Sequence, residues 1–427
     1  MLTQGQTLTV TIEKPAVGGR MIARVSGQVV LVSGAVPGER VQIRIDRIGK
    51  GVAYGDTLSV EEPSSDRRAP GTDPSCGGCL YAHIAYARQL QIKSLVIADA
   101  FGRIGRLPLS HSVAVAPSPT DGYRMRARLH YRGRRLGFVR EGTHDVCDAR
   151  ATGQLLPATC DVLDRLAADL VRLPEGAARE IDIAENVDAS ERVIHLETSP
   201  GAAASMLDLS SPRPGISGLT ATAASSGGVR VLAGSAYVTD RLTMDGQRTV
   251  TIRRHVLAFF QGNRHLLRDL VTHVTDQIPR GSATIDLYAG GGLFAIAAAQ
   301  RRGARVTAVE GDRAAAEDLA VNAAETGDVT AVHQSVETFV RSVPTGPDVV
   351  ILDPPRTGLS RDALQGLLRL RGRRIVYVSC DVATLARDAR QLVDAGYAIV
   401  RLDGFDLFPN TPHVETVVVF EMEQGRM

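Results

Sequence analysis

The last third of the chain alternates between short apolar runs and segments in which apolar residues recur at helical spacing. The apolar runs span residues 283–288, 305–310, 329–334, 347–353 and 373–379. The helical segments between and after them span residues 294–302, 312–327, 361–370 and 381–396. Strands that alternate with helices in this way predict a parallel, doubly wound α/β sheet. The nearly continuous apolar strands fit burial on both faces.

The first 60 residues follow a different pattern, in which apolar and polar positions alternate over short runs separated by glycine. This pattern predicts a small β-barrel of the oligonucleotide-binding (OB) kind. Residues 61–74 are polar and proline-containing, which is typical of a linker. Beyond them the patterns mix helix and strand. We therefore expect three domains: a barrel over 1–60, a mixed α+β central domain over 75–250 and the α/β domain over 251–427.

The composition is that of a globular protein, with 427 residues of which 44% are hydrophobic and 22% charged. There is no run of about 18 apolar residues that could span a membrane, and residues 1–15 lack the apolar block of a signal peptide. We therefore expect a cytoplasmic monomer without a membrane partner. The net charge of +2 neither requires nor excludes a nucleic-acid partner.

Positive charge is concentrated in one segment, Tyr123–Arg140, which holds seven arginines, three aromatic residues and no acidic residue. Its pattern predicts a strand hairpin. Arginines interleaved with aromatic residues suit phosphate pairing and base stacking. A solvated hairpin without a ligand is the alternative, and this segment alone does not decide between them.

A glycine-rich turn follows the first predicted strand of the α/β domain. Asp286 lies in the strand, Gly290 begins a run of three glycines, and Glu310 closes the next strand. Glycines let the backbone approach a ligand, and the distant carboxylate can accept ribose hydroxyl hydrogens. The loop lacks the G-x-G-x-x-G spacing of dinucleotide enzymes and resembles that of class I methyltransferases, which bind S-adenosyl-L-methionine. A tight turn without a ligand is the alternative.

Three further residues suggest chemistry at the same edge of the sheet. Asp353 is followed by two prolines and Arg356, whose guanidinium suits an enolate oxygen. Cys380 lies between the last predicted parallel strand and a helix, where we expect a lowered thiol pKa. Glu415 begins a C-terminal apolar strand. A buried structural cysteine and a solvated glutamate are the alternatives.

These residues fit methylation of uracil at C5, which is a poor carbon nucleophile. Attack of Cys380 on C6 would form an enolate, Arg356 would stabilise it, and Glu415 would remove the C5 proton. An N-methyltransferase in which Cys380 is incidental is a rival interpretation. An RNA-binding or chaperone protein with a vestigial methyltransferase fold is another.

Five motifs in order, FFQGN (259–263), DLYAGGG (286–292), DPPRTGL (353–359), VSCD (378–381) and HVET (413–416), resemble the uracil-5 RNA methyltransferases of the TrmA/RumA type. The resemblance implies a C-terminal Rossmann-like class I methyltransferase domain. It implies Cys380 as the nucleophile and Glu415 as the base. It also implies a set of contacts with S-adenosylmethionine: Gln261, Tyr288, Gly290, Glu310 and Asp353. Ala289 replaces a cysteine common in the family.

The resemblance extends to the rest of the chain. The first 60 residues resemble the TRAM domain, and 123–128 and 137–144 resemble the family's RNA-binding region. A structured RNA is then the substrate, with the target uridine flipped out of its stack. Ribosomal RNA is favoured over transfer RNA, because a TRAM-like N-terminus is commoner in relatives that act on it.

The chain has five cysteines, an odd number that, without a secretion signal, argues against a disulfide framework. Cys76 and Cys79 form a CxxC that, in many members of the family, binds a [4Fe-4S] cluster together with two more cysteines. The other family cysteines align with Pro70 and near Thr152. Cys147 and Cys160 could complete a four-thiolate site at a different spacing. A reduced, metal-free CxxC is the alternative.

Overall fold

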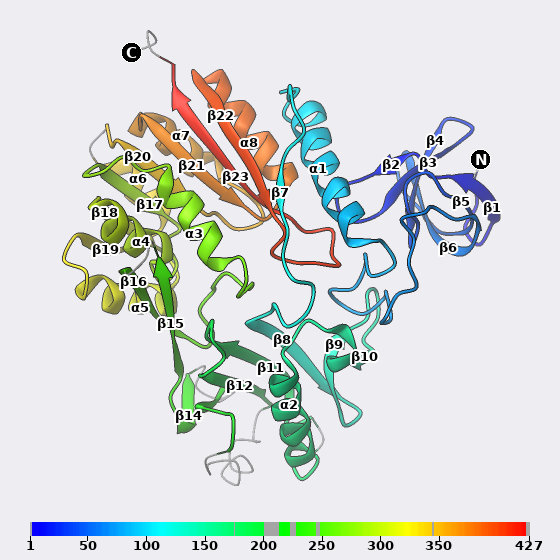
Figure 1. The fold of residues 1–427 in the computed structure, drawn as a ribbon, viewed down its shortest axis with the longest axis horizontal. Coiled ribbons are helices and arrows are strands. Elements are labelled where there is room, and N and C mark those ends of the chain that lie inside the picture. The colour runs from blue at the N-terminus through cyan, green and yellow to red at the C-terminus, as the bar shows by residue number, and fades with distance from the viewer. Residues whose placement is uncertain are drawn as a thin grey trace.

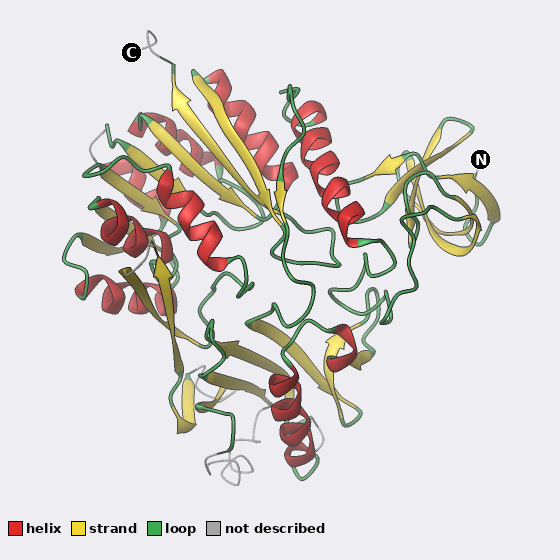
Figure 2. Cartoon of the chain, viewed as in Figure 1, coloured by secondary structure: helices red, strands yellow, loops and turns green. Residues whose placement is uncertain are grey.

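The largest sheet of the computed structural model lies in the C-terminal part of the chain and carries helices on both faces (Figure 1). The structure describes residues 2–174, 176–199, 213–222, 228–244, 248–343 and 346–423. Within this part, a smaller N-terminal sheet and a central sheet lie beside the large one (Figure 2). None of the described helices is both long and apolar enough to cross a membrane.

The N-terminal sheet has six strands in the order β1-β5-β6-β4-β3-β2. They are β1 (Thr7–Thr11), β2 (Lys14–Pro15), β3 (Met21–Val25), β4 (Gln28–Ser33), β5 (Arg40–Ile48) and β6 (Val52–Glu62). In β5, Val41, Ile43 and Ile45 are buried and alternate with more exposed polar residues. β1 also contacts β3, so the sheet curls on itself. The alternation seen in the sequence thus predicted this small barrel correctly.

The central sheet has seven strands in the order β10-β9-β8-β11-β12-β13-β14. They are β8 (Arg126–Arg132), β9 (Arg135–Val139), β10 (Val146–Asp148), β11 (Ala178–Glu185), β12 (Arg192–Thr198), β13 (Gly218–Thr222) and β14 (Val229–Gly234). Helix α2 (Pro157–Leu170) packs against β9. β8 and β9 are antiparallel, with His130 opposite Gly137, which is the hairpin expected from the arginine-rich segment. A separate ribbon, β15 (Tyr237–Met244) with β16 (Arg248–His255), leads into the last third.

The C-terminal sheet has eight strands in the order β19-β18-β17-β20-β21-β23-β22-β7. They are β7 (Val115–Ala116), β17 (Ala283–Leu287), β18 (Arg305–Glu310), β19 (Val329–His333), β20 (Val349–Leu352), β21 (Arg374–Ser379), β22 (Tyr397–Phe405) and β23 (Glu415–Met422). The five strands from β19 to β21 are parallel, as the alternation of strands and helices predicted. β23 is antiparallel to both neighbours, so the sheet is mixed. A loop without a crossover helix joins β22 to β23, and such a connection returns the chain in the opposite direction.

Two layers of helices cover this sheet. One face carries α1 (Tyr86–Arg103), α6 (Val336–Ser342), α7 (Arg361–Leu370) and α8 (Val382–Asp394). The other carries α3 (Leu267–Asp276), α4 (Leu293–Arg302) and α5 (Arg313–Ala324). α1 packs against α8, and β7 pairs with β22, so a segment from the first third of the chain completes the C-terminal sheet. The loops after the parallel strands leave the sheet at the edge formed by the carboxyl ends of these strands.

Candidate active site

The turn after β17 is built from backbone conformations that only small or strained residues adopt. Tyr288 has φ 63°, and Gly290 and Gly292 have φ 55° and 94°. A Cβ on Gly292 would lie 2.8 Å from the Leu319 side chain, so glycine is required there by both space and backbone. A Cβ on Gly290 would meet nothing within 4 Å, so this part of the turn faces open space.

Two carboxyl groups face this turn. Glu310, at the end of β18, accepts hydrogen bonds from Gly290 N (2.8 Å) and Asp312 N (2.6 Å). Asp286 is fully buried, and both of its carboxylate oxygens lack a side-chain hydrogen-bond partner. Burial, with the charges of Asp353 and Glu310 in second place, raises the pKa of Asp286 well above its usual range. The backbone N–H of Ala295 acts in the opposite direction. A buried carboxyl group without a side-chain partner requires an explanation, and a ligand with hydrogen-bond donors is one.

Gln261 and Asp353 meet on the other side of the same edge. Gln261, in the loop before α3, is buried, and its Nε2 donates to Asp353 Oδ2 at 3.0 Å. Burial raises the pKa of Asp353 to about 7, and the Gln261 hydrogen bond opposes the shift. The structure therefore brings the expected cofactor residues to one edge in two groups. Tyr288, Gly290 and Glu310 form the first group, and Gln261 and Asp353 form the second.

The loop that follows Asp353 is anchored to helix α8. Leu359 N donates to Asp388 Oδ2 at 2.9 Å, and Tyr377 OH donates to the same oxygen at 2.8 Å. Thr384 Oγ1 donates to the Arg356 carbonyl at 3.2 Å. Arg356 is thus held at the backbone while its side chain is exposed at the edge of the sheet. Asp388 could not be recognised in the sequence, because an acidic residue inside an amphipathic helix carries no signal that it is buried.

Cys380 follows β21 directly and precedes Asp381, the N-cap of α8, whose carboxylate accepts from Ala383 N and Thr384 N. The expectation of a lowered thiol pKa is wrong for this structure. Burial raises the pKa of Cys380 to about 11, and the charge of Glu415 adds to the shift. The charge of Arg356 and its hydrogen bond with the thiol act in the opposite direction. Desolvation and a nearby carboxyl group therefore outweigh the helix N-terminus.

Glu415 is the first residue of β23 and is 2% exposed. Ser379 pairs with Thr416 across the antiparallel ladder, so Cys380 and Glu415 are the next positions on their two chains. Burial and the charge of Asp353 raise the pKa of Glu415 well above its usual range, and Arg356 lowers it. The structure therefore brings together all three residues expected to be catalytic: Cys380, Glu415 and Arg356.

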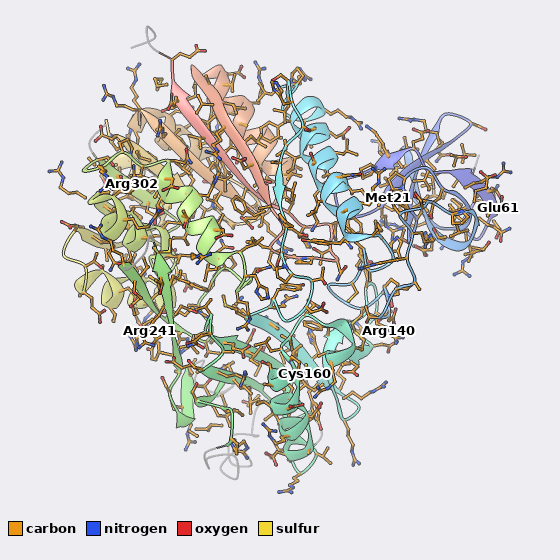
Figure 3. All side chains as sticks on the ribbon, viewed as in Figure 1. Met21, Glu61, Arg140, Cys160, Arg241 and Arg302 are labelled. Atoms are coloured by element: carbon orange, nitrogen blue, oxygen red, sulfur yellow. A yellow bond between two sulfur atoms is a disulfide. The ribbon has the colours of Figure 1, made fainter. Side chains whose placement is uncertain are left out.

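The four cysteines expected to bind metal do not form a four-thiolate site in this structure. Cys76 and Cys147 form a disulfide, whereas Cys79 and Cys160 are buried free thiols. Cys160 lies on α2 in the central region (Figure 3). In the described part of the chain, no group of three or more His, Cys, Asp or Glu residues could hold a metal ion. Both the expected four-thiolate set and the expected absence of disulfides are thus corrected, because spacing alone does not show which thiols face each other.

The anchoring of the edge loops includes contacts that link distant parts of the chain. Lys93, in α1, is buried and forms an ion pair with Asp406, which lies in the loop before β23. Lys93 Nζ and Asp406 Oδ1 are 2.5 Å apart. Asn263 Nδ2 donates to Ser118 Oγ at 2.9 Å and to the Leu407 carbonyl at 3.0 Å. These residues tie the Gln261 loop and the Glu415 loop to the sheet. No local sequence pattern pointed to them.

Comparisons with known proteins agree with this architecture. A family model described as tRNA (Uracil-5-)-methyltransferase matches residues 219–423, and the TRAM domain model matches residues 2–58. An uncharacterized RNA methyltransferase of Thermotoga maritima is 31% identical over 96% of this chain and 98% of its own length. The 23S rRNA (uracil(1939)-C(5))-methyltransferase RlmD of Cronobacter sakazakii is 30% identical over 99% of this chain and 98% of its own.

A solved structure is similar along nearly the whole chain. It is the Pyrococcus abyssi tRNA (uracil-54, C5)-methyltransferase in complex with S-adenosyl-L-homocysteine. The two share 25% sequence identity and a TM-score of 0.76, over 96% of this chain and 99% of the other. The candidate site described above lies in the part of the chain that the methyltransferase family model matches.

Proposed function

This chain belongs to the uracil-5 RNA methyltransferase family, and from that premise we propose that it methylates a ribosomal RNA uridine through a covalent Cys380 adduct. It is an S-adenosylmethionine-dependent enzyme that modifies C5 of uracil in RNA. The observation that carries the proposed mechanism is the register of β21 and β23. This register sets Cys380 beside Glu415 at the edge that also holds Asp353.

The residues of this edge fit S-adenosylmethionine. When bound, this cosubstrate supplies the methyl group and a positively charged sulfonium. Glu310 keeps free lone pairs beyond its two backbone donors and would accept hydrogen bonds from the ribose hydroxyls. Gln261 and Asp353 would line the other side of the ligand, with Tyr288 and Gly290 against its adenosine part. The open space at Gly290 supports this placement.

The reaction requires a carbon nucleophile at C5, which uracil does not offer unaided. The Cys380 thiol passes its proton to water, its sulfur attacks C6, and the C5–C6 double-bond electrons move toward O4 as an enolate. Arg356, on its anchored loop, stabilises the negative charge that develops on oxygen. C5 would then take the methyl group, and S-adenosylhomocysteine would leave. Glu415 removes the C5 proton, the S–C6 bond breaks, and Cys380 is released.

The RNA-binding surface in this proposal has two parts outside the sheet. The N-terminal barrel over residues 1–60 and the central domain over 75–250 hold the RNA, and residues 251–427 carry the chemistry. The arginines exposed on the β8–β9 hairpin support phosphate binding in the central part. Of the two relatives with named targets reported above, RlmD acts on 23S rRNA and is 30% identical over 99% of the chain, whereas the transfer RNA enzyme is 25% identical. The higher identity supports a ribosomal substrate and hence a cytoplasmic location.

Mapping 5-methyluridine in the ribosomal and transfer RNA of a strain that lacks this protein tests the substrate. The proposal predicts loss of one ribosomal 5-methyluridine, restored by the wild-type gene and not by Cys380→Ala. Loss of a transfer RNA methylation instead would refute the ribosomal assignment. Restoration by Cys380→Ala would refute the covalent mechanism.

A further inference from the structure

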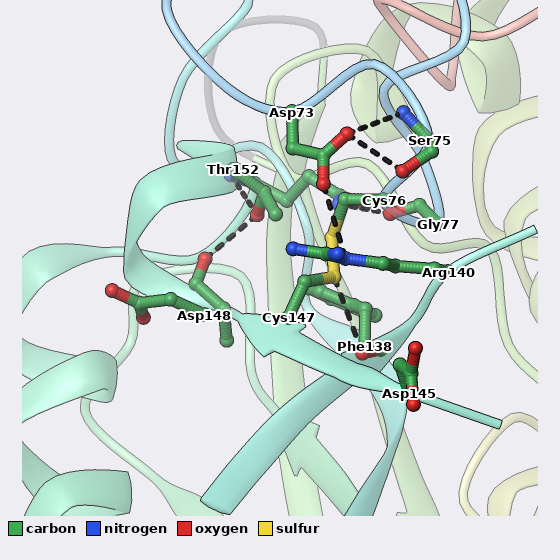
Figure 4. The surroundings of a disulfide bond; sticks show 12 residues. Asp73, Ser75, Cys76, Gly77, Phe138, Arg140, Asp145, Cys147, Asp148 and Thr152 are labelled. Atoms are coloured by element: carbon green, nitrogen blue, oxygen red, sulfur yellow. Dashed lines mark hydrogen bonds and ion pairs between the residues drawn. A yellow bond between two sulfur atoms is a disulfide. The ribbon is translucent and has the colours of Figure 1, made fainter.

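The segment that holds Cys76 and Cys79 is bonded to the β9–β10 part of the central sheet. Cys76 is fully buried and bonded to Cys147 in β10, with the two Cα atoms 6.0 Å apart across 71 residues of sequence (Figure 4). Gly77 N donates to the Val139 carbonyl at 3.0 Å. Beside the disulfide, Arg140 forms an ion pair with Asp73 at 3.0 Å. The disulfide, a hydrogen bond and an ion pair therefore all join this segment to the central sheet.

The space next to the two glycines of this segment is filled by Gln154. Its Nε2 donates to the Gly77 carbonyl at 2.9 Å, and its Oε1 accepts from Arg124 Nη1 at 2.6 Å. A Cβ on Gly78 would lie 2.4 Å from Gln154 Oε1, so the carboxamide packs directly on the backbone of the segment. Thr152 turns its hydroxyl away, to the Ala149 carbonyl at 2.7 Å.

These residues do not fit an iron–sulfur cluster. A [4Fe-4S] cluster requires four thiolates around one volume. Here Cys76 and Cys147 have bonded to each other, and Gln154 takes up the space beside their segment.

We propose that this chain holds no iron–sulfur cluster and that the Cys76–Cys147 disulfide is a redox-responsive clamp on its RNA-binding hairpin. To form it, the two thiols give up two protons and two electrons to a low-molecular-weight disulfide, which leaves as two thiols. Persistent disulfides are rare in the cytosol, where those that occur are usually transient or redox-sensing. Reduction by the same class of small thiol opens the clamp.

The cavity beside Cys147 gives a small reagent its access. It has a volume of about 300 Å³, and Cys147 and Cys160 both line it. The lining also includes the charged residues Arg134, Arg135, Asp148, Arg150 and Asp164, of which Arg150 forms ion pairs with Asp161 and Asp164 at 2.7 Å. A polar cavity of this size admits a small thiol or disulfide. Cys76, by contrast, is fully buried, so exchange begins at Cys147.

The clamp is connected to the active-site edge through Arg124. Arg124 N donates to the Gln154 carbonyl at 2.9 Å, and Arg124 is bridged to Asn263 in the Gln261 loop. Met125 N donates to the Gly262 carbonyl at 2.8 Å. Reduction of the disulfide removes the covalent restraint on the hairpin, whereas the contacts of Arg124 and Met125 near the active site remain. We therefore expect reduction to raise KM for RNA by several-fold while kcat changes less.

The test uses the full-length protein purified anaerobically, followed by iron and sulfide analysis. Free thiols are counted by alkylation in denaturant after equilibration in glutathione redox buffers. The inference predicts no stoichiometric iron, with five alkylated cysteines in reducing buffer and three in oxidising buffer, the protected pair being Cys76 and Cys147. About four irons and four sulfides per chain would overturn it. So would five alkylated cysteines in oxidising buffer. Neither measurement depends on methylation, so the proposed function can fail or hold independently.

Two variants separate the clamp from a cluster. In Cys76→Ser/Cys147→Ser, Tm and KM for RNA should no longer respond to the redox buffer, whereas oxidation of wild-type protein should raise Tm by about 5 °C or more. Cys79→Ala is the matched control, because a cluster needs Cys79 and the disulfide does not. Persistence of the redox response in Cys79→Ala supports the clamp, and its loss there contradicts it.

Discussion

Cys380 and Glu415 occupy neighbouring positions on two antiparallel chains, and each is next to a residue of the same cross-strand pair, Ser379–Thr416. The carboxyl group of Glu415 adds to the effect of burial in raising the pKa of the Cys380 thiol. A nucleophile and a base that act on adjacent ring atoms, C6 and C5, must lie this close. The register of two strands thus supplies the spacing that the chemistry requires.

The thiol pKa gives the first prediction. Glu415→Gln should lower the pKa of Cys380 from about 11, because it removes a negative charge that opposes the thiolate. Arg356→Gln should raise it. The pH dependence of iodoacetamide alkylation at Cys380, followed in the peptide by mass spectrometry, measures both. An unchanged pKa in both variants would show that burial alone controls the thiol.

Binding of S-adenosylmethionine should become tighter as pH rises through 7. Burial raises the pKa of Asp353 to about 7, and its ionised form is the one that attracts a sulfonium. Below that pKa the affinity should fall by up to about tenfold per pH unit. Calorimetric titration from about pH 6 to 8 measures this.

Two controls accompany that titration. S-adenosylhomocysteine has no sulfonium charge and should show a weaker pH dependence. Asp353→Asn should bind S-adenosylmethionine more weakly and with no dependence over the same range. An equal dependence for both ligands would contradict the role given to this carboxylate.

Asp388 should matter for stability and for rate although it lies in a helix and touches no ligand. Asp388→Ala leaves Leu359 N and Tyr377 OH without their acceptor, at a cost of about 3 kcal/mol in the free energy of unfolding. The loop that holds Arg356 should also loosen, with a lower kcat. Urea unfolding and single-turnover methylation measure the two effects. Asp394→Ala, on the exposed side of the same helix, is the control and should change neither.

The β8–β9 turn should bind RNA through charge alone. Arg132, Arg134 and Arg135 are exposed there, and changing all three to Gln should weaken RNA binding and lower the slope of log K against log salt by about 2. The kcat at saturating RNA should stay unchanged. Filter binding at several salt concentrations measures the slope. Arg313→Gln, on a helix of the C-terminal domain, should leave it as in wild type.

Much of the C-terminal fold could be predicted, because parallel strands end at one edge and motifs at strand ends therefore converge. The order of strands and motifs along the chain is enough to place Glu310, Asp353 and Cys380 at that edge. The direction of β23 in the sheet could not be predicted from the sequence, because its apolar pattern is the same whether it runs parallel or antiparallel to β21. Its antiparallel register nevertheless decides where Glu415 lies.

Properties that depend on tertiary environment could not be predicted. The pKa of Cys380 depends on burial and on the carboxyl group of Glu415, 35 residues later. Neither can be inferred from the residues next to Cys380. The pairing of Cys76 with Cys147 likewise depends on how β10 meets a loop 71 residues earlier. The buried ion pair of Lys93 with Asp406 links segments 313 residues apart.

The most direct test of the central claim is to look for the covalent adduct between Cys380 and RNA. Glu415→Gln, incubated with S-adenosylmethionine and substrate RNA, should accumulate a protein–RNA species that survives denaturation, because the C5 proton is no longer removed. Nuclease digestion and mass spectrometry should locate a methylated uridine on the peptide that contains Cys380. A Cys380→Ala variant that still forms 5-methyluridine, or a Glu415→Gln variant whose adduct lies on another residue, would contradict the account.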